Sequence, residues 1–168
     1  MGLDMYLKVI PKIEGYDFEE LIKLEDELMG DLEVLPESVR PFASPIPSLS
    51  SWYSLSFEVA YWRKANQIHA WFVENVQDGI DECESHEVSE DDLIDLLSTV
   101  SSALLEYLRS GAKGAAEVLP NATGGFFFGS TEYDEYYIEQ LTETKDLITK
   151  ALDIVNFDQQ YVYYRSSW

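Results

Sequence analysis

The sequence contains a single cysteine, Cys83, and no long apolar run. One cysteine excludes an intrachain disulfide, so the chain is compatible with a reducing cytoplasm. No stretch of about 18 apolar residues occurs, which excludes a membrane-spanning helix. The opening residues, MGLDMYLKVIPK, lack a basic segment followed by a long apolar segment, so no secretory signal is expected. We therefore expect a cytoplasmic protein.

Lysine and arginine are scarce. The 168 residues include 11 of them against 32 Asp and Glu, which gives a net charge of −21. Nucleic acid and anionic membranes repel such a chain, so we expect neither direct nucleic-acid binding nor membrane binding. The charge instead suits a basic protein surface, including one that normally holds DNA or RNA. The alternative, that the charge serves only solubility, stays open.

Motifs of enzymes and metal sites are also missing. The chain has no GxSxG motif and no nucleotide P-loop signature, so no catalytic residue is assigned and a non-enzymatic role is favoured. Cys83 and His86 are separated by two residues in the acidic stretch DECESHE, and His69 is the only other histidine. Zinc usually takes three or four ligands with Cys or His in pairs. We therefore expect no metal and no cofactor.

Apolar residues are plentiful, at 46% of the chain with 14% aromatic, and are enough to build the core of one domain spanning residues 1–168. Alternation of Leu3, Met5, Leu7 and Val9 predicts a strand over residues 2–10. In the first half of the chain the pattern further predicts a helix from Asp17, with Glu20 in a capping box, to Gly30, then a loop over 34–51 that folds over a surface, a strand over 52–57 and a helix from Val59 to Gly79. In the second half it predicts a helix from Ser89, with Asp92 in its first turn, to Gly111 and Gly114, followed by a turn at AAEVLP and a short buried strand or aromatic loop at TGGFFFGS. The last predicted elements are a helix from Ser130 or Thr131 through Val155 and a final strand over 157–168. The predicted fold is α+β, a single compact domain of about four helices packed on a small antiparallel sheet that includes both termini.

A cation pair stands out in the stretch YWRKANQIHAWFVENV, residues 61–76. If this stretch is helical, Trp62, Asn66 and His69 share one stripe. Such a stripe suits a flat anionic ligand such as a nucleotide, with cations for phosphate and an indole for stacking. Tyr133 and Asp134, in GGFFFGSTEYDEYY, could orient an arginine or His69 across a cleft. The predicted ligand-binding residues are Arg63, Lys64, Asn66, His69, Tyr133 and Asp134. The alternative is a core helix whose two cations pair with surface acids.

Acidic residues are clustered. No Lys or Arg occurs between Lys64 and Arg109, while residues 74–106 carry eleven acids, and ten more lie between Glu14 and Glu37. Acids four residues apart on a helix stand about 6 Å apart, close to the phosphate spacing of one DNA strand. The predicted partner-binding residues are Glu74, Asp78, Asp81, Glu82, Glu84, Glu90, Asp91, Asp92, Asp95, Glu132, Glu135 and Glu139. Acids in a first helical turn also stabilise the helix by themselves, so the clusters alone do not establish a function.

Three stretches carry a resemblance: GLDMYL, YWRKANQIHAWFVENVQDGID and GGFFFGSTEYDEYY. Together they cover about a third of the chain, and they resemble a group of small acidic proteins encoded by phages, prophages and other mobile elements. The resemblance supplies no catalytic residues. It implies an accessory protein in the cytoplasm of the infected bacterium, of the kind that antagonises host nucleases or defence complexes.

The leading hypothesis is a phage-type accessory protein that binds and blocks a basic, nucleic-acid-handling host protein, as a nucleic-acid mimic. The alternative is a nucleotide-binding or nucleotide-sequestering protein, or a hydrolase, with a pocket around Arg63, Asn66, His69 and Asp134. A third hypothesis is an assembly protein, for which an exposed apolar dimer face and a homo-oligomer would be the sign.

Overall fold

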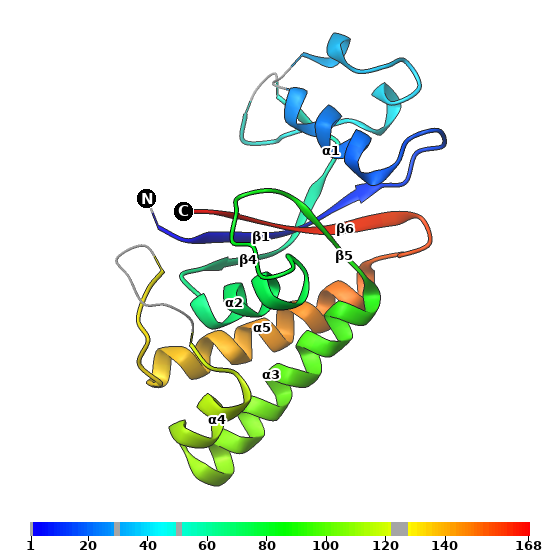
Figure 1. The fold of residues 1–168 in the computed structure, drawn as a ribbon. Helices are drawn as coiled ribbons and strands as arrows, with labels where there is room; N and C mark the ends of the chain where they lie inside the picture. Colours follow the sequence, from blue (N-terminus) through cyan, green and yellow to red (C-terminus); the bar gives the residue numbers. More distant parts are fainter. Residues whose placement is uncertain (1, 29–30, 50–51, 122–127) are drawn as a thin grey trace.

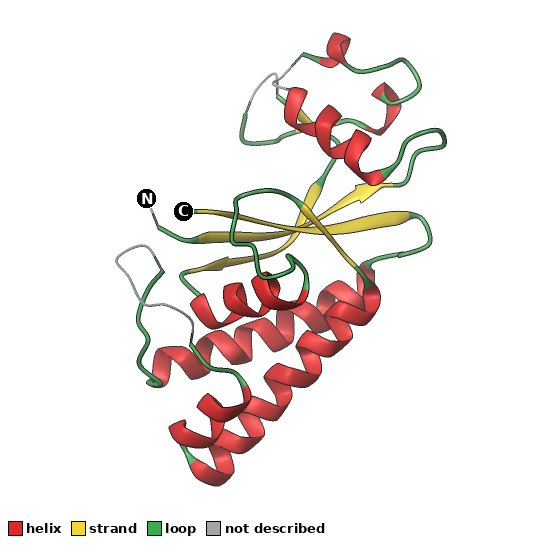
Figure 2. Cartoon of the chain, viewed as in Figure 1, coloured by secondary structure: helices red, strands yellow, loops and turns green. Residues whose placement is uncertain are grey.

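The computed structural model describes residues 2–28, 31–49, 52–121 and 128–168. As predicted, the fold is α+β, with helices packed on an antiparallel sheet (Figures 1 and 2). The elements, in chain order, are β1 (Asp4–Pro11), α1 (Phe18–Glu27), the 3-10 helices η1 (Leu32–Val34) and η2 (Arg40–Phe42), β2 (Ser44–Pro45), β3 (Tyr53–Ser54), β4 (Phe57–Arg63), α2 (Asn66–Asn75), β5 (His86–Val88), α3 (Glu90–Ser110), α4 (Ala112–Val118), α5 (Glu135–Ile154) and β6 (Gln160–Ser167).

The two strands nearest the chain ends lie side by side at the centre of the main sheet (Figure 1). Its order is β4-β1-β6-β5, and all neighbouring strands are antiparallel. The pairing of β1 with β6 extends from Asp4 opposite Ser167 to Pro11 opposite Gln160. The prediction that the sheet includes both termini is therefore confirmed.

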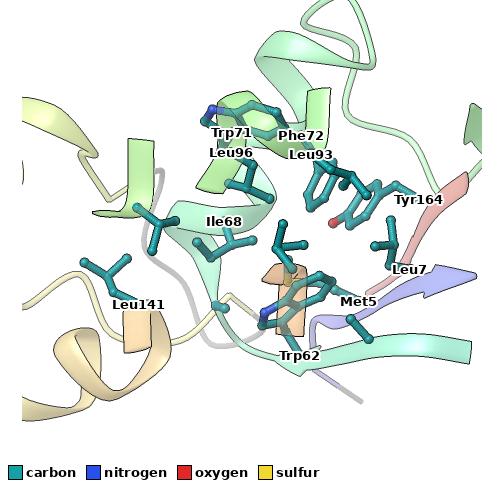
Figure 3. Packing of buried hydrophobic residues seen from close by; sticks show 14 of the residues in the cluster. Met5, Leu7, Trp62, Ile68, Trp71, Phe72, Leu93, Leu96, Leu141 and Tyr164 are labelled. Carbon is teal, nitrogen blue, oxygen red and sulfur yellow. The ribbon is translucent and has the colours of Figure 1, made fainter. Parts of the chain in front are cut away.

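Helices cover this sheet on both faces, and each face has its own core. On one face, α2, α3 and α5 pack over Leu3, Met5, Leu7 and Val9, which are all fully buried (Figure 3). On the other face, α1 and the segment that follows it cover a smaller cluster, with Ile10, Ile13, Phe18, Leu21, Leu35, Val39 and Tyr163 among its members. The 34–51 segment thus folds over a surface, as predicted, and it contributes Leu35 and Val39 to this second core.

Two helix starts predicted from the sequence are confirmed by their capping geometry. The Asp17 carboxylate accepts a hydrogen bond from the Glu20 amide at 2.9 Å, and Glu20 accepts one from the Asp17 amide at 3.0 Å. Ser89 and Asp92 form the same reciprocal box at the start of α3. Each box satisfies amide groups that a helix N-terminus would otherwise leave without partners.

The prediction of a helix beginning at Val59 is wrong. Residues 57–63 form β4, which pairs with β1, and α2 begins only at Asn66. Ala60 and Trp62 are buried whereas Tyr61 and Arg63 are exposed, which is the two-residue period of a strand. Lys64 makes the turn between strand and helix with φ 57°, a left-handed conformation that is uncommon outside glycine.

Other boundaries also need correction. The short strand β5 lies between the predicted helices that end at Gly79 and begin at Ser89, where no strand was predicted, and the predicted turn at AAEVLP overlaps α4. Gly114 therefore does not end a helix: it lies inside α4, where an added Cβ would come within 2.8 Å of the Glu106 carbonyl oxygen on α3. The cap of α5 is Asp134 and not Ser130 or Thr131. The predicted stop at Gly30 and most of TGGFFFGS lie outside the described residues. In the part of the chain that the structure describes, no helix combines the length and apolar character needed to cross a membrane.

One hydrogen bond in the larger core ties β4 to α5. The indole N–H of Trp62 donates to Thr144 Oγ1 at 2.9 Å, and this threonine hydroxyl donates to the Gln140 carbonyl at 2.6 Å. Trp62 is 2% exposed and Thr144 is 0% exposed. Water therefore cannot replace the threonine oxygen as acceptor.

We predict that Thr144→Val lowers the free energy of unfolding by about 1–3 kcal/mol, because the buried indole N–H loses its acceptor. Urea unfolding followed by tryptophan fluorescence measures the change. Thr142→Val is the matched control, since Thr142 is exposed on the same helix and bonds only to the Ile138 carbonyl. Its effect should stay within about 0.5 kcal/mol. Equal losses in the two variants would contradict the role of the Trp62 bond.

Candidate functional site

The predicted ligand-binding residues on the 61–76 stretch have separate surroundings. Arg63 is exposed at the end of β4, with its Nε 4.0 Å from Asp4 Oδ1. Asn66 is 1% exposed and donates from Nδ2 to the Ser130 carbonyl at 2.6 Å. Lys64 occupies the turn between them. The shift from strand to helix at this turn explains why the stripe expected for one continuous helix does not form.

Tyr133 and Asp134 form hydrogen bonds at the N-terminus of α5. The Tyr133 hydroxyl accepts a hydrogen bond from the Asn121 amide at 3.0 Å, and Asp134 Oδ1 accepts one from the Tyr137 amide at 3.1 Å. These contacts close the loop before α5 and cap the helix. Asp134 is therefore a capping residue in this structure and makes no hydrogen bond with His69.

His69 belongs to a buried polar network. Its Nδ1 lies 2.7 Å from the Tyr164 hydroxyl oxygen and its Nε2 lies 3.0 Å from Asp81 Oδ1. A carboxylate only accepts, so Nε2 carries the proton and Nδ1 accepts from the tyrosine hydroxyl. The side chain that orients His69 is thus Asp81, from the loop after α2, and not the predicted Asp134.

Burial controls the titration of this network. Burial lowers the pKa of His69 below the ordinary value of 6.5. The neighbouring Asp81 carboxylate opposes this effect without cancelling it. Burial also holds the pKa of Tyr164 well above 10.0. The Tyr164 ring is stacked on Phe72, with the ring centres 4.0 Å apart (Figure 3). At neutral pH the network is therefore an uncharged histidine and tyrosine in the core wall, anchored to one carboxylate at the surface.

We predict a pKa below 6.5 for His69 and a still lower one in Asp81→Asn, because the variant loses the carboxylate that favours the protonated ring. An NMR titration of the imidazole nitrogens measures both values, and His86 gives the only other histidine signal. The unfolded chain binds this proton more readily than the folded one. Stability from His69 is therefore present above pH 6.5 and is lost as the pH falls through its folded pKa. A pKa of His69 at or above 6.5 would contradict the buried arrangement.

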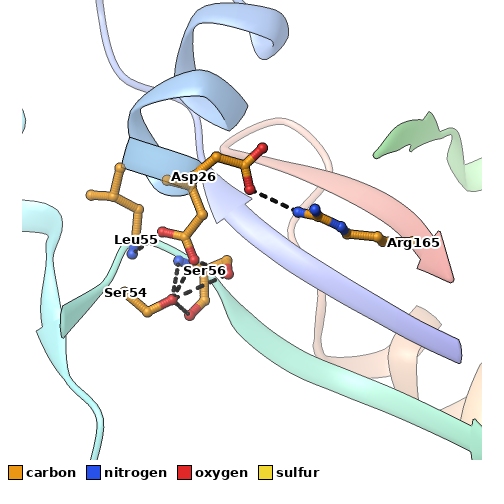
Figure 4. Close-up of polar contacts among 6 residues, drawn as sticks. Asp26, Ser54, Leu55, Ser56 and Arg165 are labelled. Atoms are coloured by element: carbon orange, nitrogen blue, oxygen red, sulfur yellow. Dashed lines mark hydrogen bonds and ion pairs between the residues drawn. The ribbon is translucent and has the colours of Figure 1, made fainter. Parts of the chain in front are cut away.

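The Glu25 side chain on α1 binds the turn between β3 and β4, whose residues Ser54, Leu55 and Ser56 are labelled in Figure 4. One carboxylate oxygen accepts from the hydroxyls of Ser54, at 2.6 Å, and Ser56, at 2.8 Å. The other accepts from the Leu55 amide at 2.6 Å. Beside it, Arg165 Nη1 on β6 lies 2.7 Å from Asp26 Oδ1. These contacts hold α1 against the sheet and mark a structural cluster, because the carboxylate is fully occupied by its own chain.

We predict that Glu25→Ala lowers the free energy of unfolding by about 2 kcal/mol or more, since three hydrogen bonds to a charged acceptor are lost together. Glu27→Ala is the control. Glu27 is exposed at the end of the same helix, so its change should be within about 0.5 kcal/mol. Chemical denaturation of both variants makes the comparison. A loss of stability no larger than that of the control would show that the Glu25 hydrogen bonds do not stabilise the turn between β3 and β4.

The predicted partner-binding acids are distributed over separate parts of the surface. The first turns of α3 and α5 lie at opposite ends of this helix pair (Figure 1). Glu90, Asp91, Asp92 and Asp95 are therefore remote from Glu132, Glu135 and Glu139. The acids of the α2–β5 loop are separate from both of these groups. Glu84, next to Cys83, lines a groove of about 500 Å³ between this loop and α1, with Asp26 and Arg165 among its other lining residues. The twelve residues do not make one face.

One continuous acidic strip does form, along α5. Four exposed carboxylates lie on it, those of Glu135, Glu139, Glu143 and Asp146. They lie on one open face of α5, together with Ile138, Thr142, Leu147 and Lys150. None of the four carboxylates forms an ion pair with the described residues. We refer to these four carboxylates as the α5 strip. The partner-binding prediction included Glu135 and Glu139 but missed Glu143 and Asp146, although their i, i+4 and i, i+3 spacing was visible in the sequence.

The surface provides little internal compensation for its charge. Within the described ranges, ion pairs of arginine with carboxylates involve Asp4, Glu106 and Asp26. No set of three or more metal-ligating side chains comes together there. Cys83 is exposed, and His86 Nε2 stands 3.9 Å from Glu82 Oε1.

Comparisons with protein-family models, curated proteins and solved structures give no match to this chain. The function is therefore argued from the residues and their geometry.

Proposed function

We propose that the protein binds a basic surface of a partner protein through the α5 strip, and that it blocks a nucleic-acid-handling host protein by occupying the surface that holds nucleic acid. The observation that carries this proposal is the strip itself: four exposed carboxylates on one helix face, without ion-pair partners among the described residues. Carboxylates in such a row attract cations without offering a cavity for chemistry.

The geometry of the strip supports a mimic of a nucleic-acid backbone. Glu135, Glu139 and Glu143 are successive i, i+4 residues, so they rise about 6 Å per step along α5. The through-space distance between neighbouring phosphates of one DNA strand is of the same order, and a basic channel built for phosphates can accept such a row of charges. Ile138 and Leu147 lie on the same face of α5 and add apolar contact area between the carboxylates.

Four substitutions test the strip: Glu135→Gln, Glu139→Gln, Glu143→Gln and Asp146→Asn in one variant. Basic proteins are captured from a bacterial lysate on the wild-type chain and purified, and their affinity for each form is measured with and without competing duplex DNA. We expect at least about tenfold weaker binding for the strip variant, displacement by DNA, and a slower association at high salt.

The matched control removes the same number of charges elsewhere, through Glu19→Gln, Glu27→Gln, Glu33→Gln and Glu37→Gln, all at exposed positions. Its affinity should remain within about threefold of the wild type. Equal weakening of the two variants would mean attraction by net charge alone. Binding that neither salt nor DNA changes would refute the proposal.

The nucleotide-binding alternative has weaker support. The cavity that contains Arg63 measures about 150 Å³ and is lined also by Tyr61, Tyr136 and Glu143. Cavities that hold drug-sized ligands measure about 300–1,000 Å³. His69 and Asn66 are not among its lining residues. We therefore base the proposed function on the strip.

A further inference from the structure

A second cavity, of about 460 Å³, lies where α2 passes α3 and the end of α4. α2 lines it with Gln67, Trp71, Glu74 and Asn75, and Thr99 of α3 and Val118 and Leu119 at the end of α4 line the other side. The volume is within the range of small-ligand sites. Trp71 is 8% exposed and Leu119 is 4% exposed, so the walls belong to the packed core and are held in place by it.

A chain of amides fixes which atom of Gln67 is available to a ligand. The Arg63 carbonyl can only accept, so the Gln140 nitrogen faces it, at 3.4 Å. The Gln140 oxygen then accepts from the Gln67 nitrogen at 2.9 Å. Gln67 Oε1 is left as an acceptor, and no described residue donates to it. Gln67 is 1% exposed and lines the cavity, so its oxygen is an acceptor in the cavity lining for which the described residues supply no donor.

Most of the other polar groups of the cavity are acceptors, and the Thr99 hydroxyl can donate or accept. Asn75 donates from Nδ2 to the Trp71 carbonyl at 2.8 Å, which leaves its oxygen to face outward. Glu74 adds an exposed carboxylate, and no Lys or Arg lines the cavity. A ligand that matches this wall must carry several N–H donors and a positive charge.

We propose that this cavity binds a guanidinium group. A planar cation with five N–H donors can lie over the indole of Trp71 while it donates to Gln67 Oε1 and to the Glu74 carboxylate. An anion would face the Glu74 carboxylate with little beside the Thr99 hydroxyl to donate to it, and a neutral apolar ligand would leave Gln67 Oε1 unsatisfied. The site is separate from the α5 strip, so either proposal can fail without the other.

Two sources can supply the group, a free guanidinium compound or an arginine of a protein. NMR titrations of the full chain with agmatine and with a capped Gly-Arg-Gly tripeptide distinguish them. The readout is the indole N–H signal of Trp71, which Trp71→Phe identifies among the four tryptophans. We expect saturable shifts of that signal, and the tighter of the two probes indicates the source. A capped tripeptide with citrulline, which has the same shape without charge, should bind at least about tenfold more weakly.

Glu74→Gln should weaken guanidinium binding by about tenfold, since a charge-assisted hydrogen bond becomes a neutral one. Glu87→Gln is the control: it makes the same chemical change at an exposed residue of β5 that does not line the cavity, and it should change the affinity by less than about twofold. The proposal is overturned if neither probe saturates, if citrulline binds as tightly as arginine, or if the control variant loses as much as Glu74→Gln.

Discussion

The pairing of β1 with β6 is the constraint on which the rest of the structure depends. It joins residues at opposite ends of the chain at the centre of the sheet, so the C-terminal strand contributes residues to both cores. Val162 and Tyr164 of β6 face the larger core, whereas Tyr163 faces the smaller one. A strand buried on both faces couples the two helical layers. Contacts between residues this far apart in sequence form only after a long loop has closed, and closing that loop costs conformational entropy. This favours slow, cooperative folding.

The polar side chains of the core extend this coupling to the helices. Trp62 reaches Thr144, and His69 reaches both Tyr164 and Asp81. Each contact satisfies a group that would be costly to bury alone, and each joins elements distant in sequence. With a net charge of −21, repulsion among the carboxylates destabilises the folded state. The cores and these satisfied networks must offset that repulsion, since few surface acids are paired internally.

The sequence predicted what local patterns determine. The two-residue period of Leu3 to Val9 and the capping boxes at Asp17 and Ser89 are encoded within a few residues, and all were confirmed. Trp62 fits the alternation of a strand and also continues the helical stripe of α2, so periodicity alone could not place the boundary at Lys64. The side chains that contact His69 and Gln67 could not be predicted from the sequence for another reason. Asp81 lies in an irregular loop, and Gln140 stands 73 residues from Gln67, so only tertiary packing brings them together.

The amide chain also bears on how the cavity relates to the acidic helix. Gln140 lies on α5 between Glu139 and Glu143, and its side chain contacts both Gln67 and the carbonyl of Arg63. A cation that binds Gln67 Oε1 polarises this amide and strengthens its bond to Gln140, since hydrogen bonds in a chain reinforce one another in a low-dielectric interior. The cavity lining is therefore joined to α5 by one hydrogen bond, from Gln67 to Gln140. Gln140 can make both bonds in one amide orientation only, so a donor bound to Gln67 Oε1 would favour the orientation that is already present.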